Sequence, residues 1–120
     1  MPASRTERRN FRVAGIVVEE ETDRPLADLI VRAFDRDMFF DDKIGYTSTD
    51  SDGRFEIRYG ADQFRDLWES RPDLYLRIYD ASGARLLHET TDAVRPNASE
   101  DEHYRIAIPA HALGGDADRG

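Results

Sequence analysis

The feature that most constrains the fold is the segment 49–59, in which an acidic turn ending at Gly53 leads directly into alternating apolar and charged residues. The apolar positions are Phe55, Ile57 and Tyr59. A period of two places alternate side chains on opposite faces of an extended chain, so this pattern predicts a half-buried β-strand launched from a tight turn. Strand and turn signals of the same kind recur along the chain.

These recurring signals predict seven short strands separated by turns. The expected strands span residues 11–19, 29–34, 44–49, 54–59, 73–80, 85–89 and 104–108. Between the fourth and fifth strands, Phe64, Leu67 and Trp68 have the spacing of one helix face, so we expect a short helix whose aromatic side chains close one end of the domain. Short amphipathic strands with hairpin-length connections predict an all-β fold, a seven-stranded antiparallel β-sandwich.

Length and charge limit the organisation and the partners of the chain. Its 120 residues suit one domain, and we expect a flexible basic arm over 1–10, the sandwich over 11–109 and a disordered tail over 110–120. The net charge of −8 repels nucleic acid and anionic membranes, so neither is an expected partner. The N-terminal residues lack the apolar core of a signal peptide, which predicts a cytoplasmic protein unless a dedicated secretion system exports it.

Several short motifs follow one another in a characteristic order. They are Val13-x-Gly15-x-Val17, Pro25-Leu26, Val31-x-Ala33 and Thr49-Asp50-x-Asp52-Gly53-x-Phe55-x-Ile57. This order resembles the transthyretin-like, carboxypeptidase-regulatory-like family of β-sandwich domains over residues 11–109, and the resemblance implies a Greek-key sandwich. Asp35-x-Asp37 and Ile44-Gly45 are similar to a bacterial subgroup in which the domain is a binding or spacer module. The resemblance therefore implies a non-enzymatic protein-interaction or adaptor module.

Enzymes of related fold have signatures that this sequence lacks. Hydroxyisourate hydrolases end in Tyr-Arg-Gly-Ser, whereas the last strand here ends Ile-Ala-Ile-Pro. Intradiol dioxygenases hold iron with two tyrosines and two histidines, and His88, His103 and His111 do not have that spacing. His103 shares the outward parity of Arg105, which predicts an exposed histidine. The sequence also has no G-x-S-x-G motif, so we expect no enzymatic activity, and a small hydrolase is the remote alternative.

Six aspartates concentrate in loops that flank neighbouring strands. They are Asp35, Asp37, Asp41, Asp42, Asp50 and Asp52. Carboxylate oxygens in this number suit calcium, although the segment after Asp52 lacks the bidentate glutamate of an EF-hand. Two interpretations stay open, a calcium site and ordinary turn formation by Asp and Gly. Calcium is the one cofactor that the pattern raises, and a calcium- or carbohydrate-binding domain is the alternative function.

Three large apolar residues, Met38, Phe39 and Phe40, interrupt the polar connection between the second and third strands. Either these side chains fold back over the end of the sandwich, or they form a contact surface. The second arrangement predicts a protein partner or self-association, because a few large side chains usually dominate an interface. A small-molecule or sugar ligand is the remaining class of partner.

Overall fold

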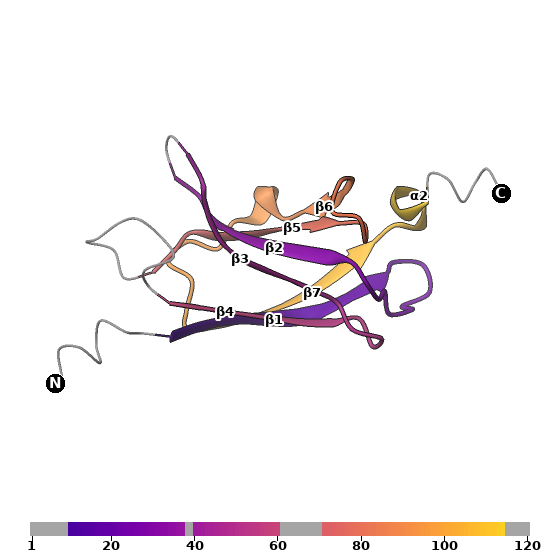
Figure 1. The fold of residues 1–120 in the computed structure, drawn as a ribbon, viewed down its shortest axis with the longest axis horizontal. Helices are drawn as coiled ribbons and strands as arrows, with labels where there is room; N and C mark the ends of the chain where they lie inside the picture. The colour runs from indigo at the N-terminus through magenta and orange to yellow at the C-terminus, as the bar shows by residue number, and fades with distance from the viewer. Residues whose placement is uncertain (1–9, 38–39, 61–70, 115–120) are drawn as a thin grey trace, which may run out of the picture.

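The computed structural model describes residues 10–37, 40–60 and 71–114, and these form two β-sheets that face each other (Figure 1). The strands are β1 (Asn10–Glu19), β2 (Ile30–Asp35), β3 (Asp42–Ser48), β4 (Arg54–Gly60), β5 (Leu74–Tyr79), β6 (Leu86–Glu89) and β7 (Asp101–Ile108). A 3-10 turn, η2 (Thr91–Ala93), precedes β7, and a short helix, α2 (Ala110–Leu113), follows it. The predicted β-sandwich is therefore confirmed.

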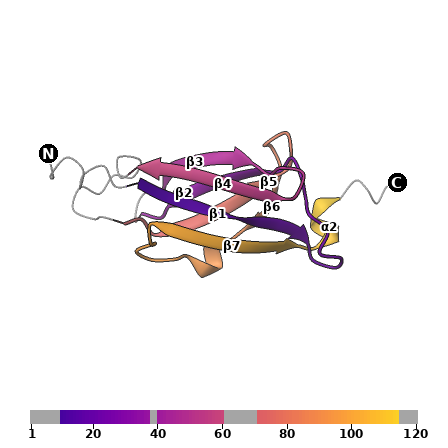
Figure 2. The same ribbon diagram turned by 90° about the horizontal axis from the view of Figure 1, so that it is seen from below.

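The strand order is β4-β1-β7 in one sheet and β3-β2-β5-β6 in the other. β1 pairs with β7 in parallel, from Arg12 opposite Asp101 to Glu19 opposite Ile108. The other pairs between named strands are antiparallel, so the prediction of a wholly antiparallel sandwich is wrong at this one pair. The strands that begin and end the sandwich thus lie side by side (Figure 2).

The core lies between the sheets and consists of the inward residues of each strand. Phe55 and Ile57 of β4 are buried, as their alternation predicts, and the charged side chains that alternate with them are exposed. Leu74, Leu76 and Ile78 of β5 are fully buried on the opposite sheet. Burying one such aliphatic side chain contributes about 1.5–3 kcal/mol, so the periodic apolar residues fix which face of each strand turns inward.

The turn that launches β4 is held by its own side chains. Asp50 Oδ1 accepts hydrogen bonds of 2.9 Å from the N–H groups of Asp52 and Arg54. The buried Thr49 hydroxyl donates to the carbonyl oxygen of Leu26 at 2.7 Å, which ties the turn to the connection after β1. The carboxylate of Asp50 therefore serves the turn, as one of the two interpretations of the aspartates predicted.

The C-terminal end differs from its prediction. Residues 110–113, expected within a disordered tail, form α2. The guanidinium of Arg85 donates hydrogen bonds to the carbonyl oxygens of Ala112 and Leu113, at 3.1 and 2.6 Å. These bonds satisfy carbonyl groups that the end of a helix leaves without partners. No element in the described part of the chain is a helix long and apolar enough to cross a membrane.

Some predictions concern segments that the structure does not describe. The helix expected from Phe64, Leu67 and Trp68 lies outside the described residues, and so do Met38, Phe39 and the basic arm up to residue 9.

Candidate functional site

The six aspartates of the predicted calcium site are divided between the two ends of the sandwich. Four lie where β2 ends and β3 begins: Asp35, Asp37, Asp41 and Asp42. The other two, Asp50 and Asp52, lie in the turn at the opposite end of β3 (Figure 1). Within the residues that the structure describes, no group of three or more His, Cys, Asp or Glu side chains is placed to hold a metal ion.

The predicted contact tip is described only at Phe40, whose side chain is exposed. Next to it, Asp41 accepts hydrogen bonds from the Asp37 N–H and from the Tyr75 hydroxyl, and these bonds lower the pKa of the Asp41 carboxyl. The Asp41 carboxylate thus ties the loop to β5. The contact role of the tip stays a prediction.

The interior becomes polar at the end of the sandwich where β1 begins. Asp35 and Tyr104 point inward there from β2 and β7, and each is only 8% exposed. Burial raises the pKa of Asp35 to about 6, and it raises the pKa of Tyr104 to about 12. The buried Tyr104 hydroxyl has no hydrogen-bond partner in the described structure. Burial also raises the pKa of Tyr59 on β4, and the negative charges of Glu102 and Asp35 add to this rise.

Arg95 covers this polar end from the connection before β7. Its guanidinium carbon lies 3.7 Å from the centre of the Tyr104 ring, and Nη1 lies 2.7 Å from the Glu102 carboxylate. The same nitrogen donates to the carbonyl oxygen of His103 at 2.8 Å. Arg95 therefore fixes the start of β7 and the direction in which its side chains leave the strand.

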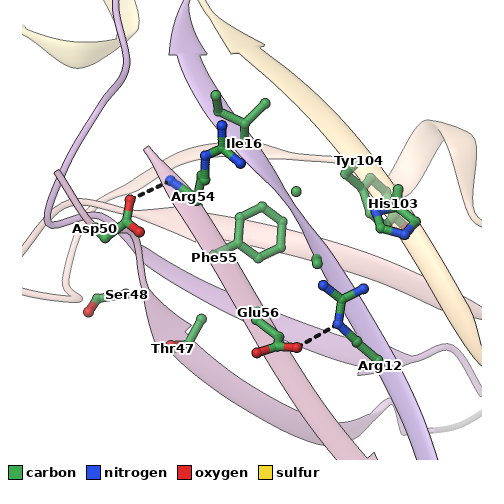
Figure 3. Close-up of a pocket in the computed structure, with 12 residues that line it drawn as sticks. Arg12, Ile16, Thr47, Ser48, Asp50, Arg54, Phe55, Glu56, His103 and Tyr104 are labelled. Carbon is green, nitrogen blue, oxygen red and sulfur yellow. Dashed lines mark hydrogen bonds and ion pairs between the residues drawn. The ribbon is translucent and has the colours of Figure 1, made fainter. Parts of the chain in front are cut away.

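An open hollow of about 710 Å³ lies over the outer face of the three-stranded sheet and extends past β4 to Thr47, Ser48 and Asp50 (Figure 3). Its floor is the centre of β1, where Ala14 and Gly15 carry little or no side chain. Arg54 and Glu56 line it from β4, and His103 lines it from β7. The volume is in the range of small-molecule sites, which usually occupy about 300–1,000 Å³.

A network of charges crosses all three strands at one side of the hollow. Arg12 donates hydrogen bonds to Glu56 on β4 and, at 2.9 Å, to Asp101 on β7. The bond from Arg12 lowers the pKa of Glu56, and the two carboxylates raise the pKa of Arg12. Arg58 joins the network through a 2.9 Å ion pair with Glu56. The guanidinium of Arg12 is thus bonded to Glu56 and Asp101, and its bond to Asp101 holds that carboxylate in place.

Two of the side chains that line the hollow, His103 and Arg54, are placed to act on a bound molecule. His103 Nε2 lies 3.2 Å from Asp101 Oδ1, while no hydrogen bond to its other ring nitrogen occurs in the described structure. Arg54 forms none of the side-chain ion pairs among the described residues, and its guanidinium points over Ile16 (Figure 3). A histidine held by a carboxylate can accept or donate a proton, and an unpaired guanidinium binds an anion. The arrangement can therefore hold an acidic molecule and move a proton on it.

The exposure of His103 was predicted correctly, since its side chain is 65% exposed, but its partner was not predicted. Asp101 and His103 are two residues apart on one face of a strand, which is the one signal that the sequence contains. Arg12 completes the group from a strand 89 residues away in sequence. Neither periodicity nor spacing predicts that neighbour.

The three histidines are not arranged as an iron centre of the intradiol type. His88 lies on β6, His103 on the outer face of β7, and His111 on α2. Tyr59 and Tyr104 turn into the sandwich, away from the outer face that carries His103. The described residues therefore do not fit that metal group.

The fold is similar to parts of known oxygenases. A 9R-lipoxygenase from Cyanothece PCC8801 matches over 82% of this chain with a TM-score of 0.60 and 24% identity, and the match spans only 16% of the lipoxygenase. The dioxygenase domain of a dioxygenase carbohydrate-binding protein fusion from Streptomyces sp. SirexAA-E matches over 88% of this chain and 83% of its own length, with a TM-score of 0.53 and 18% identity. No family model and no curated protein matches the sequence.

These structures overturn the prediction of a non-enzymatic adaptor module. That prediction took the sandwich as a sign of binding and spacer modules, whereas solved structures that share its fold belong to enzymes. The physical reason is that a sandwich fold supplies a scaffold and leaves the chemistry to the side chains placed on it. The absence of familiar enzyme motifs in the sequence was therefore insufficient to predict no activity.

Proposed function

We propose that this chain is an oxygenase-type enzyme domain that binds a small hydroxylated carboxylic acid in the hollow over the three-stranded sheet. The observation that carries the proposal is that His103, which is paired with Asp101, lines the same hollow as Arg54, which forms no side-chain ion pair among the described residues. The names of the structural neighbours, a lipoxygenase and a dioxygenase domain, support the reaction class. The match covers only 16% of the lipoxygenase. The proposal therefore concerns one domain and not a whole lipoxygenase.

The register of the sheet sets the size of the substrate. Arg54 lies opposite Ile16 and His103 lies opposite Ala14, so the two side chains stand diagonally across β1. With strands about 4.8 Å apart and a rise of about 3.3 Å per residue, their backbones are about 12 Å apart. Both side chains reach toward the hollow, which leaves room for one ring between them. The carboxylate would bind Arg54, and the hydroxyl would face His103.

In this arrangement His103 is the proton acceptor for the substrate hydroxyl. The Asp101 carboxylate, whose Oδ1 lies 3.2 Å from His103 Nε2, orients the imidazole. Ionising the hydroxyl increases the electron density of the substrate, which prepares it for oxidation by dioxygen. The described residues thus contribute binding, orientation and proton transfer.

Ionisation of a bound phenol tests these roles. We expect 4-hydroxy-3-nitrophenylacetate to bind, and its absorbance to show a larger ionised fraction when bound than when free at the same pH. His103→Gln should keep binding within about twofold but abolish the extra ionisation, because glutamine cannot accept the proton. Arg54→Gln should weaken binding about tenfold, the effect of losing one charge-assisted contact of about 1.4 kcal/mol.

Arg24→Gln is the matched control, because Arg24 does not line the hollow and its side chain is 60% exposed. It should bind the probe as the unaltered protein does. Oxygen uptake with 4-hydroxyphenylacetate then tests the reaction class. Unchanged binding in Arg54→Gln would contradict the proposed site, and ionisation without oxygen uptake would contradict the oxygenase assignment.

We also propose that the sandwich is of the transthyretin-like, Greek-key type. The described strands in two facing sheets and the motif order from Val13 to Ile57 support this assignment. It concerns the scaffold, and the chemistry proposed above depends only on the outer face.

A further inference from the structure

The outer face of the four-stranded sheet carries a row of aromatic and cationic side chains. Arg32 on β2 lies between Tyr46 on β3 and Tyr79 on β5, with its guanidinium carbon 5.6 and 5.3 Å from the two ring centres. Tyr46 is 70% exposed, so its ring is open to solvent. Arg32 makes no side-chain ion pair in the described structure. The face therefore offers solvent a flat ring and an uncompensated positive charge.

A β-bulge in the pairing of β2 with β3 lies beside a hollow next to Tyr46. The register shifts between Ala33 and Phe34, so that Ala33 pairs with Gly45 and Phe34 pairs with Lys43. A hollow of about 260 Å³ opens at this bulge, lined by Arg32, Lys43 and Tyr46 together with apolar atoms of their neighbours. Bulges often lie next to functional sites, where they redirect side chains.

The charges of this hollow are complementary to an anion. Its lining contains two cationic side chains, Arg32 and Lys43, and no carboxylate. The chain as a whole has a net charge of −8, so this hollow is a positive site on an acidic protein. Aromatic rings stack on exposed tyrosine rings, and guanidinium and ammonium groups bind carboxylates.

We infer that this hollow binds a small aromatic carboxylate, with the ring against Tyr46 and the carboxylate between Arg32 and Lys43. Both parts of the ligand are needed, because an exposed ion pair or an exposed stacking contact is weak alone. The hollow lies on the opposite sheet from His103 and Arg54, so the inference does not depend on the proposed function.

Titration of the labelled protein with benzoate, followed by amide chemical shifts, tests the inference. Benzoate should shift the amides of Arg32, Lys43 and Tyr46 in a saturable manner. Acetate lacks the ring and benzyl alcohol lacks the charge, so each should bind at least about tenfold more weakly than benzoate. Shifts confined to the Arg54 hollow would overturn this inference while supporting the proposed function, and the absence of saturable shifts would also overturn it.

Substitutions on the exposed face separate the two contacts. Tyr46→Ala and Lys43→Gln should each weaken benzoate binding about fivefold to tenfold, whereas Tyr46→Phe should retain it because the ring remains. Leu86→Ala, at another exposed apolar side chain of the same sheet, is the control and should leave binding unchanged. Equal affinity in Tyr46→Ala and the control would show that the ring does not hold the ligand.

Discussion

Gly15→Ala is expected to lower the free energy of unfolding by about 3 kcal/mol, the upper end of the usual cost of overpacking. A Cβ atom at this position would lie 2.3 Å from the carbonyl oxygen of Tyr104 and 3.0 Å from the Phe55 ring. The backbone oxygen belongs to β7, which is paired in parallel with β1, so relief requires the two strands to separate. Urea denaturation of both proteins measures the difference.

Gly83→Ala provides the matched control. It adds the same methyl group at a turn where the nearest atom is 3.8 Å away, although the φ of 80° disfavours a side chain. Its cost should be about 1 kcal/mol, from backbone strain alone. A Gly15→Ala protein as stable as Gly83→Ala would mean that β1 and β7 can move apart without loss, contrary to the close pairing described.

Asp35→Asn is expected to raise the free energy of unfolding by about 3 kcal/mol at pH 7. Burial raises the folded-state pKa of Asp35 from 3.8 to about 6. Between these values the unfolded chain loses the proton first, so the stability of the unaltered protein falls as the pH rises, and the whole loss is present above pH 6. Asparagine carries no charge and keeps the Oδ1 atom that accepts the Asp73 N–H at 2.8 Å.

Denaturation curves at several pH values between 3.5 and 7.5 check this expectation. The difference between Asp35→Asn and the unaltered protein should grow with pH and then level off. Asp52→Asn, in the exposed turn before β4, controls for the loss of one negative charge. A difference that stays constant over this range would show that the Asp35 carboxyl is not buried in its charged form.

The strands could be predicted from sequence because their inward faces repeat with a period of two. The alternation of Phe55, Ile57 and Tyr59 alone sets the face of β4, and the same reasoning holds for β5 and β7. The parallel pairing of β1 with β7 could not be predicted. An alternating pattern shows which side chains of a strand turn inward, but it does not show which strand lies next to it. Helix α2 was missed because four residues are too few to show a helical pattern.

The candidate site was harder to predict because it is assembled across strands. The aspartates are close in sequence, yet the length of β3 separates Asp50 from Asp42. Conversely, Arg54 and His103 line one hollow although they are 49 positions apart in the sequence, because β1 stands between their strands. A hydrophobic pattern contains no information about which outward residues of neighbouring strands meet.

The parallel pairing of the first and last strands has a consequence for the order in which the sandwich is completed. β1 is the middle strand of its sheet, so it needs β4 on one side and β7 on the other. During synthesis β1 leaves the ribosome first, whereas β7 is added about 90 residues later. Until then one edge of a largely apolar strand is unpaired and open to other chains. Slow folding and a period of vulnerability to aggregation on the ribosome follow from this single strand pair.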